Sequence, residues 1–467
     1  MKPLDVRIRQ RDFEALMRHL HSDGNEQHAF LLCGLTEAES RTLMTVREMM
    51  FADPLTDLSQ QSPAYVSLRS SYALGALERA IKEGLHLSDV HSHPFCEDGV
   101  RFSSIDRSAA RRRFEWHRER VPSLVSVGLV FGRTSVYGEY QDRATGKVRR
   151  VRSLEIVGQQ TSVWEAGGNR GRESSMDFER FDRQVRAFGV EVQSKLQTMT
   201  IGVAGCGGTG SAVVQQLGHL GIRRFVLCDP DAVCESNLNR LIGAVREDAV
   251  SRASKANVAA RLIRTVSPDA EVVGFAESVD HPNVRRAFAE CDAVFGCGDN
   301  AGVRAVLTDI AARCLIPYFD LGVGIVANAG RIVSAGGQVV AFYPGGPCLG
   351  CSGKLNPVRV AEALRTPEER AVVEAAYGAP TPQPSVVGLN GVVASLAVGE
   401  FLKYASGWTP LATRLQHDAA TGEVQRFGSE LNSECPYCSK SGVLGRGLDG
   451  PVRPEWIAPI PEVRLEN

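Results

Sequence analysis

The sequence predicts an α/β protein with two folded parts, an N-terminal α+β domain and a doubly wound domain with a mostly parallel sheet. Three observations support this prediction. The 467 residues are too many for one ordinary hydrophobic core. A polar, Gly-rich stretch at 165–175 is typical of a solvated linker. After it, short apolar segments alternate with helical ones, as in parallel strands joined by helices.

The segments before the linker predict the α+β domain. Three apolar runs are typical of short strands, and two longer segments have helical composition. The strands are expected at 30–33, 87–91 and 124–131, and the helices at 72–83 and 105–118. We place this domain at 1–160 and the linker at 161–176.

The segments after the linker predict the doubly wound domain. Strands are expected at 200–204, 224–228, 271–275 and 293–296, and helices at 210–220 and 255–265. Because strands and helices alternate, the sheet is expected to be mostly parallel. This domain is placed at 177–442, and a Pro- and Gly-rich tail at 443–467.

The composition narrows the class of protein. Lys and Arg number 53 against 54 Asp and Glu, so the net charge of -1 gives no overall attraction for nucleic acid or anionic membrane. The N-terminus has no continuous apolar stretch, which argues against a signal peptide or membrane span and for a cytoplasmic protein. Most of the 12 cysteines stand singly, as reduced thiols do.

A glycine-rich turn follows the first strand of the second domain. Gly205, Gly207, Gly208 and Gly210 lie between that strand and the next helix, and Asp229 ends the following strand. Such glycines permit a tight turn and let a helix N-terminus approach a phosphate, while the carboxylate accepts hydrogen bonds from ribose hydroxyls. The pattern predicts a site for ATP or a dinucleotide.

The polar run after Asp229 separates these two ligands. It begins Asp229-Pro-Asp231 and continues to Asn237-Leu-Asn-Arg240, where a redox Rossmann fold needs little more than the acid. The run resembles the ubiquitin-activating superfamily, the MoeB/ThiF/HesA type of adenylyltransferase. The resemblance implies a Rossmann-like ThiF-type domain in which Asp229, Asp231, Asn237 and Arg240 line ATP.

Three further motifs occur in that family's order. Arg183, in an Arg-Phe-Asp-Arg-Gln motif, matches an arginine that reaches the ATP phosphates, in bacterial dimers from the partner subunit. Lys255 matches the phosphate-binding lysine at a slightly longer spacing, and Asp299-Asn300 matches the pair whose aspartate holds magnesium. The resemblance therefore implies ATP and Mg²⁺ as cofactors, and a homodimer.

The expected chemistry agrees with these residues. Attack of a C-terminal carboxylate on the α-phosphate of ATP brings like charges together, so the site needs cations. Arg183, Arg240, Lys255 and magnesium on Asp299 would supply them. The expected products are an acyl-adenylate and pyrophosphate.

Four cysteines form two Cys-x-x-Cys pairs. Cys348 and Cys351 make the first, and Cys435 and Cys438 the second. Four thiolates presented in this way suit tetrahedral Zn²⁺ with no open position, and two pairs favour a metal over a redox dithiol. The family carries the same two pairs as a structural zinc site.

The segment between Cys351 and Cys435 contains no cysteine, although many relatives carry one there that takes the acyl group as a thioester. The enzyme is therefore expected to stop at the adenylate, which an acceptor attacks directly. Ester formation on Ser385 is the disfavoured alternative, because serine lacks an easily formed thiolate.

A second metal pattern lies in the first domain. His91 and His93 end a strand and face one side of it, and Asp106 begins the next helix, which predicts three ligands and one open position. The His-x-His-Pro and Ser-x-x-Asp segments resemble the JAMM (JAB/MPN) metallopeptidase signature. The loop between them is one residue longer than usual, with Phe102 where the serine would fall.

That resemblance implies a zinc peptidase domain. Its residues would be His91, His93 and Asp106 as ligands of a catalytic Zn²⁺, Ser103 at the oxyanion and Glu26 as the base. The alternative is an inactive JAMM fold that is kept for binding. The nearby run Arg111-Arg-Arg113 is interpreted as the solvated face of a helix, with a basic patch for a partner as the alternative.

Both domains then act at the C-terminus of ubiquitin-like proteins. The leading interpretation is a bacterial-type conjugation enzyme that adenylates its modifier and also processes or deconjugates it, with a conjugating-enzyme-like protein as a further partner. Sulfur-carrier activation, with conversion of the adenylate to a thiocarboxylate, is the first alternative. A scaffold with both sites inactive and a nicotinamide oxidoreductase are the others. The intact site residues argue against the scaffold, and the polar run that ends at Arg240, which would then have no role, argues against the oxidoreductase.

Overall fold

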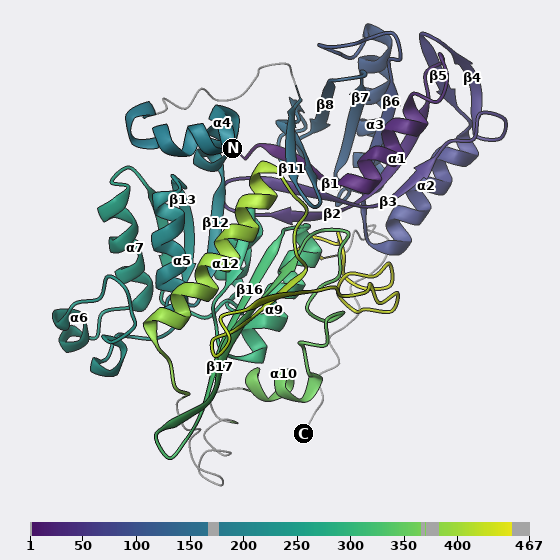
Figure 1. The fold of residues 1–467 in the computed structure, drawn as a ribbon. Coiled ribbons are helices and arrows are strands. Elements are labelled where there is room, and N and C mark those ends of the chain that lie inside the picture. The colour runs from purple at the N-terminus through teal and green to yellow at the C-terminus, as the bar shows by residue number, and fades with distance from the viewer. Residues whose placement is uncertain (1, 167–176, 366–368, 370–382, 451–467) are drawn as a thin grey trace. The chain divides into compact units, whose positions relative to one another are not determined.

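The computed structural model describes residues 2–166, 177–365, 369 and 383–450 (Figure 1). The chain forms two compact units. The first holds the residues up to Ile156, with further pieces that begin at Val163 and Gly445. The second holds Val157–Ser162 and Arg172–Leu444. Of the predicted linker, 167–176 lies outside the described residues, and Thr161–Glu165 forms a strand.

The first unit is built on one large mixed sheet. Its elements are β1 (Leu4–Arg9), α1 (Gln10–Leu20), β2 (His28–Glu37), β3 (Thr42–Phe51), β4 (Leu58–Ser62), β5 (Tyr65–Leu68), α2 (Ser70–Glu83), β6 (His86–Ser92), α3 (Ser104–Arg120), β7 (Ser126–Phe131), β8 (Val136–Gln141), β9 (Val148–Arg150), β10 (Ser153–Val157) and β11 (Thr161–Glu165). The sheet order is β11-β10-β1-β3-β2-β6-β7-β8-β9. The predicted strands lie in β2, β6 and β7 and the predicted helices in α2 and α3, so these predictions are confirmed.

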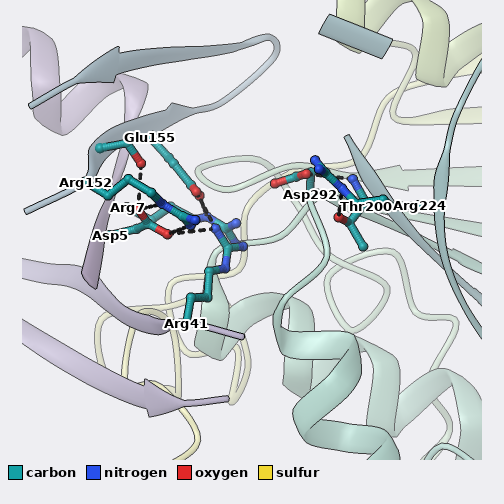
Figure 2. A network of polar contacts seen from close by, with 9 residues as sticks. Asp5, Arg7, Arg41, Arg152, Glu155, Thr200, Arg224 and Asp292 are labelled. Carbon is teal, nitrogen blue, oxygen red and sulfur yellow. Dashed lines mark hydrogen bonds and ion pairs between the residues drawn. The ribbon is translucent and has the colours of Figure 1, made fainter. Parts of the chain in front are cut away.

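Ion pairs and hydrogen bonds join buried side chains of β1 to residues in and next to β10 (Figure 2). The Nε of Arg7 on β1 donates to Glu155 on β10 at 2.7 Å. Asp5, which is fully buried, accepts hydrogen bonds from Arg152 Nε and from Ser153, both at 2.8 Å. Because each buried carboxylate faces at least one guanidinium, the charges are compensated where water is excluded.

Residues 445–449, here called the C-terminal strap, complete the sheet of the first unit. Strand β6 pairs with β2 only as far as Cys33, which leaves the next residues of β2 with an open edge. The strap fills that edge: Gly34 N–H donates to Gly445 O at 3.1 Å, and Leu448 N–H donates to Thr36 Oγ1 at 3.0 Å. Backbone groups on a buried strand need such partners, so the strap is part of this fold.

The second unit is doubly wound. Its elements are α4 (Phe178–Thr198), β12 (Thr200–Ala204), α5 (Gly208–His219), β13 (Arg224–Cys228), a 3₁₀ turn η1 (Glu235–Asn237), α6 (Arg246–Ser251), α7 (Lys255–Val266), β14 (Glu271–Phe275), α8 (Pro282–Ala289), β15 (Ala293–Gly296), α9 (Ala301–Cys314), β16 (Tyr318–Asn328), β17 (Arg331–Phe342), α10 (Pro357–Ala363), α12 (Val387–Ser406), β18 (Arg414–Asp418) and β19 (Val424–Phe427). The four predicted strands coincide with β12 to β15, and the predicted helices lie in α5 and α7.

The sheet of this unit has the order β14-β13-β12-β15-β16-β17-β18-β19. The five strands from β14 to β16 are parallel, and β17, β18 and β19 each pair antiparallel with the strand before them. The parallel half carries the predicted motifs, which agrees with the prediction of a mostly parallel sheet. Helices α5, α7 and α12 bury their apolar residues in one core with the strands. At the amino end of β12, Asp292 accepts from Thr200 N–H at 2.8 Å, and Arg224 donates to the Thr200 hydroxyl (Figure 2).

Among the described residues, no helix is both long and apolar enough to cross a membrane.

Candidate functional site

Three parallel strands of the second unit end side by side. Cys228 of β13 pairs with Ala204 of β12, and Ala204 pairs with Gly296 of β15. The loops that follow these strands therefore leave the sheet at one edge. In an open parallel sheet, this carboxyl edge is where ligands bind.

The first of these loops depends on glycine at two positions. Gly205 has φ +90°, and a Cβ there would lie 2.9 Å from the carbonyl carbon of Cys297. A Cβ on Gly210 would lie 1.9 Å from Gly205 O. Gly207 precedes α5 without a side-chain cap, so the first N–H groups of that helix are open to an anion. The loop therefore offers a phosphate cradle.

Asp229 fixes the glycine loop to the next loop. One carboxylate oxygen accepts from Cys206 N–H at 2.7 Å, and the other accepts from Asp231 N–H at 2.9 Å. Burial raises the pKa of this carboxyl above its usual value, while these N–H groups and Lys255 oppose the rise. Its position at the end of β13 is the one expected for a ribose contact.

Lys255 and Asp231 form an ion pair at the same edge. Lys255 begins α7, and its ammonium lies 2.7 Å from a carboxylate oxygen of Asp231. The lysine side chain is mostly buried, at 13% exposure, whereas that of Asp231 is exposed. The charge of Lys255 is therefore held at this edge of the sheet.

Asn237 ends η1, and Arg240 lies in the turn that follows. Asn237 is buried, and its side-chain oxygen accepts from Cys234 N–H at 3.2 Å, which shapes the turn. Arg240 donates to Ser236 O at 2.6 Å, and its stem lies 3.3 Å from the point where a Cβ of Gly208 would stand. The guanidinium is thus anchored beside the phosphate cradle.

Asp299 and Asn300 follow β15 at the same edge. The side-chain oxygen of Asn300 caps α9 by accepting from Val303 N–H at 2.8 Å. Asp299 is exposed directly before this cap. A carboxylate at that position suits Mg²⁺, which prefers oxygen ligands and one or two carboxylates beside phosphate groups.

Arg183 lies on α4, away from this edge. Its neighbour Gln184 donates to His219 O at the end of α5, and Arg180 donates to Val266 O at the end of α7. Helices α5 and α7 begin at the site and each runs for about 18 Å. Arg183 is therefore near the opposite ends of both helices, and its own chain does not bring it to the nucleotide loops.

A buried side chain from α12 also reaches the glycine loop. Asn390 is 2% exposed, and its amide nitrogen lies 2.4 Å from where a Cβ of Gly208 would stand. The same nitrogen donates to the Ser385 hydroxyl at 3.2 Å. Sequence reasoning gave Asn390 no role, because a single polar residue in an apolar helix carries no spacing signal.

The four paired cysteines come together as predicted. The Sγ atoms of Cys348 and Cys435 lie 3.4 Å apart, and those of Cys351 and Cys438 lie 3.3 Å apart. All four lie within 4.8 Å of one another and none is in a disulfide. Tetrahedral Zn²⁺ with thiolate bonds of about 2.3 Å requires such S–S spacings, so this donor set fits structural zinc.

His91, His93 and Asp106 form a second cluster, in the first unit. Their ligand atoms lie within 4.8 Å of one another. Asp106 lies 3.5 Å from His91 Nε2 and 3.3 Å from His93 Nε2, through different oxygens. His91 Nε2 is buried and makes no hydrogen bond in the described structure. Two imidazoles and a carboxylate around a buried open nitrogen fit a zinc ion with an open position.

Glu26 lies at this cluster, just before β2. Its carboxylate is 3.5 Å from His93 Nε2 and only 4% exposed. Burial raises the pKa of Glu26 to about 7, although the two histidines lower it. A carboxyl with a pKa in this range is suited to accept a proton at neutral pH.

The extra loop residue before α3 has a structural explanation. Phe102 is buried, with its ring stacked on His91 at 5.8 Å between centroids. Ser103 then caps α3 by accepting from Asp106 N–H at 3.2 Å, and Asp106 accepts in return from Ser103 N–H. The longer loop thus adds a core residue and still orients Asp106. The Ser103 hydroxyl keeps a proton to donate to an oxyanion.

Two residues near this cluster, Asp89 and Arg113, were not predicted from the sequence to interact. Asp89 lies two positions before His91 on β6, and Arg113 of α3 approaches it to 2.5 Å. Burial alone would raise the pKa of Asp89, but Arg113 and His28 hold it below its usual value. The solvated-face interpretation is therefore wrong for Arg113. The alternation of Asp89 with the two histidines was a signal that could have revealed Asp89, although not its partner Arg113.

Comparison with known proteins concerns mainly the second unit. The model of the ThiF family matches residues 181–437. The SAMP-activating enzyme E1 of Haloferax volcanii is 29% identical over 277 residues, covering 58% of this chain and 93% of that protein. The sulfur carrier protein ThiS adenylyltransferase of Escherichia coli is 28% identical over 268 residues, covering 57% of this chain and 96% of that protein.

Two other similar proteins are covered less completely. The adenylyltransferase and sulfurtransferase MOCS3 of Sus scrofa is 29% identical over 269 residues, and the chain spans 53% of its length. A crystal structure of E. coli MccB with AMPCPP and MccA is 18% identical, covering 57% of this chain and 75% of that one, with a TM-score of 0.46.

Proposed function

Because the chain belongs to the ThiF family, whose model matches 181–437, we propose that it adenylates the C-terminal carboxylate of a ubiquitin-like or sulfur-carrier protein. The names of two similar proteins, ThiS adenylyltransferase and MOCS3, both refer to sulfur carriage or transfer. Sulfur-carrier activation is therefore favoured over the conjugation pathway, which was the leading interpretation of the sequence.

One observation carries the proposal: the loops after β12, β13 and β15 meet at one sheet edge, with cations held beside them. The N-terminus of α5 and Arg240 would hold the phosphates, and Asp229 the ribose. A carboxylate oxygen of the carrier protein would then bond to the α-phosphorus, and the bond to the bridging oxygen would break. The products are an acyl-adenylate and pyrophosphate.

Two further residues would serve the phosphates. Lys255 would leave Asp231 to neutralise negative charge on the phosphate groups. Asp299 would hold Mg²⁺, which supplies charge stabilisation for the leaving pyrophosphate. The cap that Asn300 makes on α9 would keep Asp299 in place.

The acyl group would go directly from the adenylate to an acceptor. The segment between the two cysteine pairs offers no thiol, and the Ser385 hydroxyl is engaged by the buried amide of Asn390. Sulfide or an acceptor amine would attack the carbonyl carbon and expel AMP. Sulfide gives a thiocarboxylate and an amine gives a conjugate, so analysis of the product distinguishes the two pathways.

The first unit is proposed to be a zinc hydrolase that acts on the same carrier protein. His91, His93 and Asp106 would hold the ion, which supplies a polarised water at its open position. Glu26 would accept the proton of the attacking water, and Ser103 would donate to the oxyanion. This role would trim a precursor or release a linked carrier.

The adenylation proposal is tested by exchange of labelled pyrophosphate into ATP. The purified full chain is mixed with Mg²⁺, ATP, labelled pyrophosphate and a candidate carrier protein, with and without the carrier's C-terminal residue. Exchange that requires the intact C-terminus supports the proposal. Absence of exchange with every carrier tested would redirect it to a small carboxylate substrate.

Arg183 is proposed to act in a partner subunit, because its own chain holds it about one helix length from the site. Arg183→Ala and Asp299→Ala chains should each be inactive alone. In a hybrid dimer, one of the two sites contains both intact residues. The rate of pyrophosphate exchange per subunit should therefore return to about a quarter of wild type in a random mixture and to about a half in isolated hybrids. Arg186→Ala, which removes a nearby exposed charge, is the control. No recovery in verified mixed dimers would contradict action across subunits.

A further inference from the structure

A polar pocket opens in the first unit between α3 and the β8–β9 hairpin. Its volume is about 440 Å³. The lining consists of Arg111 and Glu115 from α3 and Gln141, Gly146, Lys147 and Val148 from the hairpin. None of these lining residues belongs to the metal cluster.

The pocket is connected to the metal cluster along one face of α3. Asp106 of the cluster is followed by Arg107, and Arg107, Arg111 and Glu115 recur at four-residue spacing, which places them on the same face. Arg107 Nε lies 3.6 Å from Glu139 on β8. One face of α3 therefore carries side chains from the residue after a metal ligand to the pocket.

Positive charge predominates along this path. Arg150 pairs in register with Glu139, and its guanidinium lies 5.4 Å from the ring centre of Tyr137. A Cβ on Gly146 would meet Arg118 at 2.4 Å, so this arginine also borders the pocket. We call the set Arg107, Arg111, Arg118, Lys147 and Arg150 the basic strip.

The basic strip contrasts with the chain as a whole. It holds five cations, whereas the net charge of the protein is -1. Of the carboxylates placed beside it, Glu115 lines the pocket, Glu139 is buried and accepts from the Tyr137 hydroxyl, and Asp142 pairs with Arg149. A local excess of positive charge attracts a negatively charged partner and fixes its orientation.

We propose that the basic strip binds an acidic peptide segment of the protein that is hydrolysed at the metal cluster. This segment would flank the scissile bond on one side. This rests on the proposed hydrolase function. Glu115 stands among the cations in the pocket, so the strip suits a chain whose carboxylates are spaced among neutral groups. A continuous line of phosphates would be repelled at Glu115, which argues against nucleic acid.

The test uses the full chain and a fluorescein-labelled peptide of alternating Glu and Gly, with binding followed by fluorescence anisotropy at low salt. Arg111→Glu and Lys147→Glu should each weaken binding by about tenfold, because one attraction becomes one repulsion. Arg112→Glu is the matched control, since Arg112 is exposed next to Arg111 and does not line the pocket. It should change the dissociation constant by less than about twofold.

Three outcomes would overturn the proposal: equal weakening by Arg111→Glu and Arg112→Glu, no binding of the acidic peptide, or tighter binding of a labelled oligodeoxyadenylate of equal charge. A His93→Ala variant separates this result from the hydrolase proposal. It should keep the wild-type affinity for the peptide while losing zinc. Hydrolysis without peptide binding would reject the basic strip alone, and peptide binding without hydrolysis of any carrier would reject the hydrolase alone.

Discussion

Asp299→Ala should lower pyrophosphate exchange by about 10²- to 10³-fold, the loss that follows when a preorganised electrostatic contact is removed from a reacting centre. The carboxylate lies exposed at the carboxyl edge of β15, where it would hold Mg²⁺ against the leaving phosphates. Without it, the leaving pyrophosphate would lose its charge stabilisation. The rate of exchange should fall more than the affinity for ATP, because α5 and Arg240 still hold the nucleotide.

Asp269→Ala is the matched control for this variant. Asp269 is also exposed, but it precedes β14 and therefore lies at the opposite, amino edge of the parallel strands. It should leave exchange within about twofold of wild type. Equal activity of both variants at saturating Mg²⁺ would refute the assignment of Asp299.

Glu26→Gln should abolish hydrolysis of a tailed carrier precursor, with a loss of about 10²- to 10⁴-fold, the usual contribution of a general base. The amide keeps the shape of the side chain but cannot accept the proton of water. Zinc content should stay at the wild-type value, because Glu26 lies outside the ligand set. Release of the tail is followed by mass spectrometry, and pyrophosphate exchange should be unchanged.

Two comparisons make this result specific. Glu119→Gln alters an exposed glutamate at the end of α3 and should cleave at the wild-type rate. His93→Ala should lose both the zinc and the cleavage. If Glu26→Gln cleaved as fast as wild type, a different base would be required. If wild type did not cleave and bound no zinc, the first unit would be a binding domain.

Local sequence patterns were sufficient to predict many elements of the second unit. The bounds of β12, β13 and β15 could be predicted because each is a short apolar run that ends at or just before glycine or aspartate, and β14 was predicted from its short apolar run alone. The clustering of Cys348 with Cys435 followed from the preference of paired thiolates for one metal, although 87 residues separate them. In these cases the residue type itself specifies its partner.

Contacts between distant and chemically ordinary residues could not be predicted. Arg113 belongs to a run of three arginines, and nothing in that run distinguishes the one that turns inward to Asp89. The bond between Leu448 and Thr36 joins residues 412 positions apart in a tail with no apolar periodicity. Such contacts depend on which strand edge the fold leaves open, and that is settled only when the whole sheet has formed.

The C-terminal strap has a consequence for synthesis on the ribosome. Roughly 290 residues separate the last strands of the first unit from the strap. At about 5–20 residues per second, the strap is synthesised roughly 15–60 s after those strands. During this interval the open edge of β2 is available to other unpaired strands, including those of neighbouring nascent chains. Chaperone demand should therefore persist until residue 449 has left the exit tunnel.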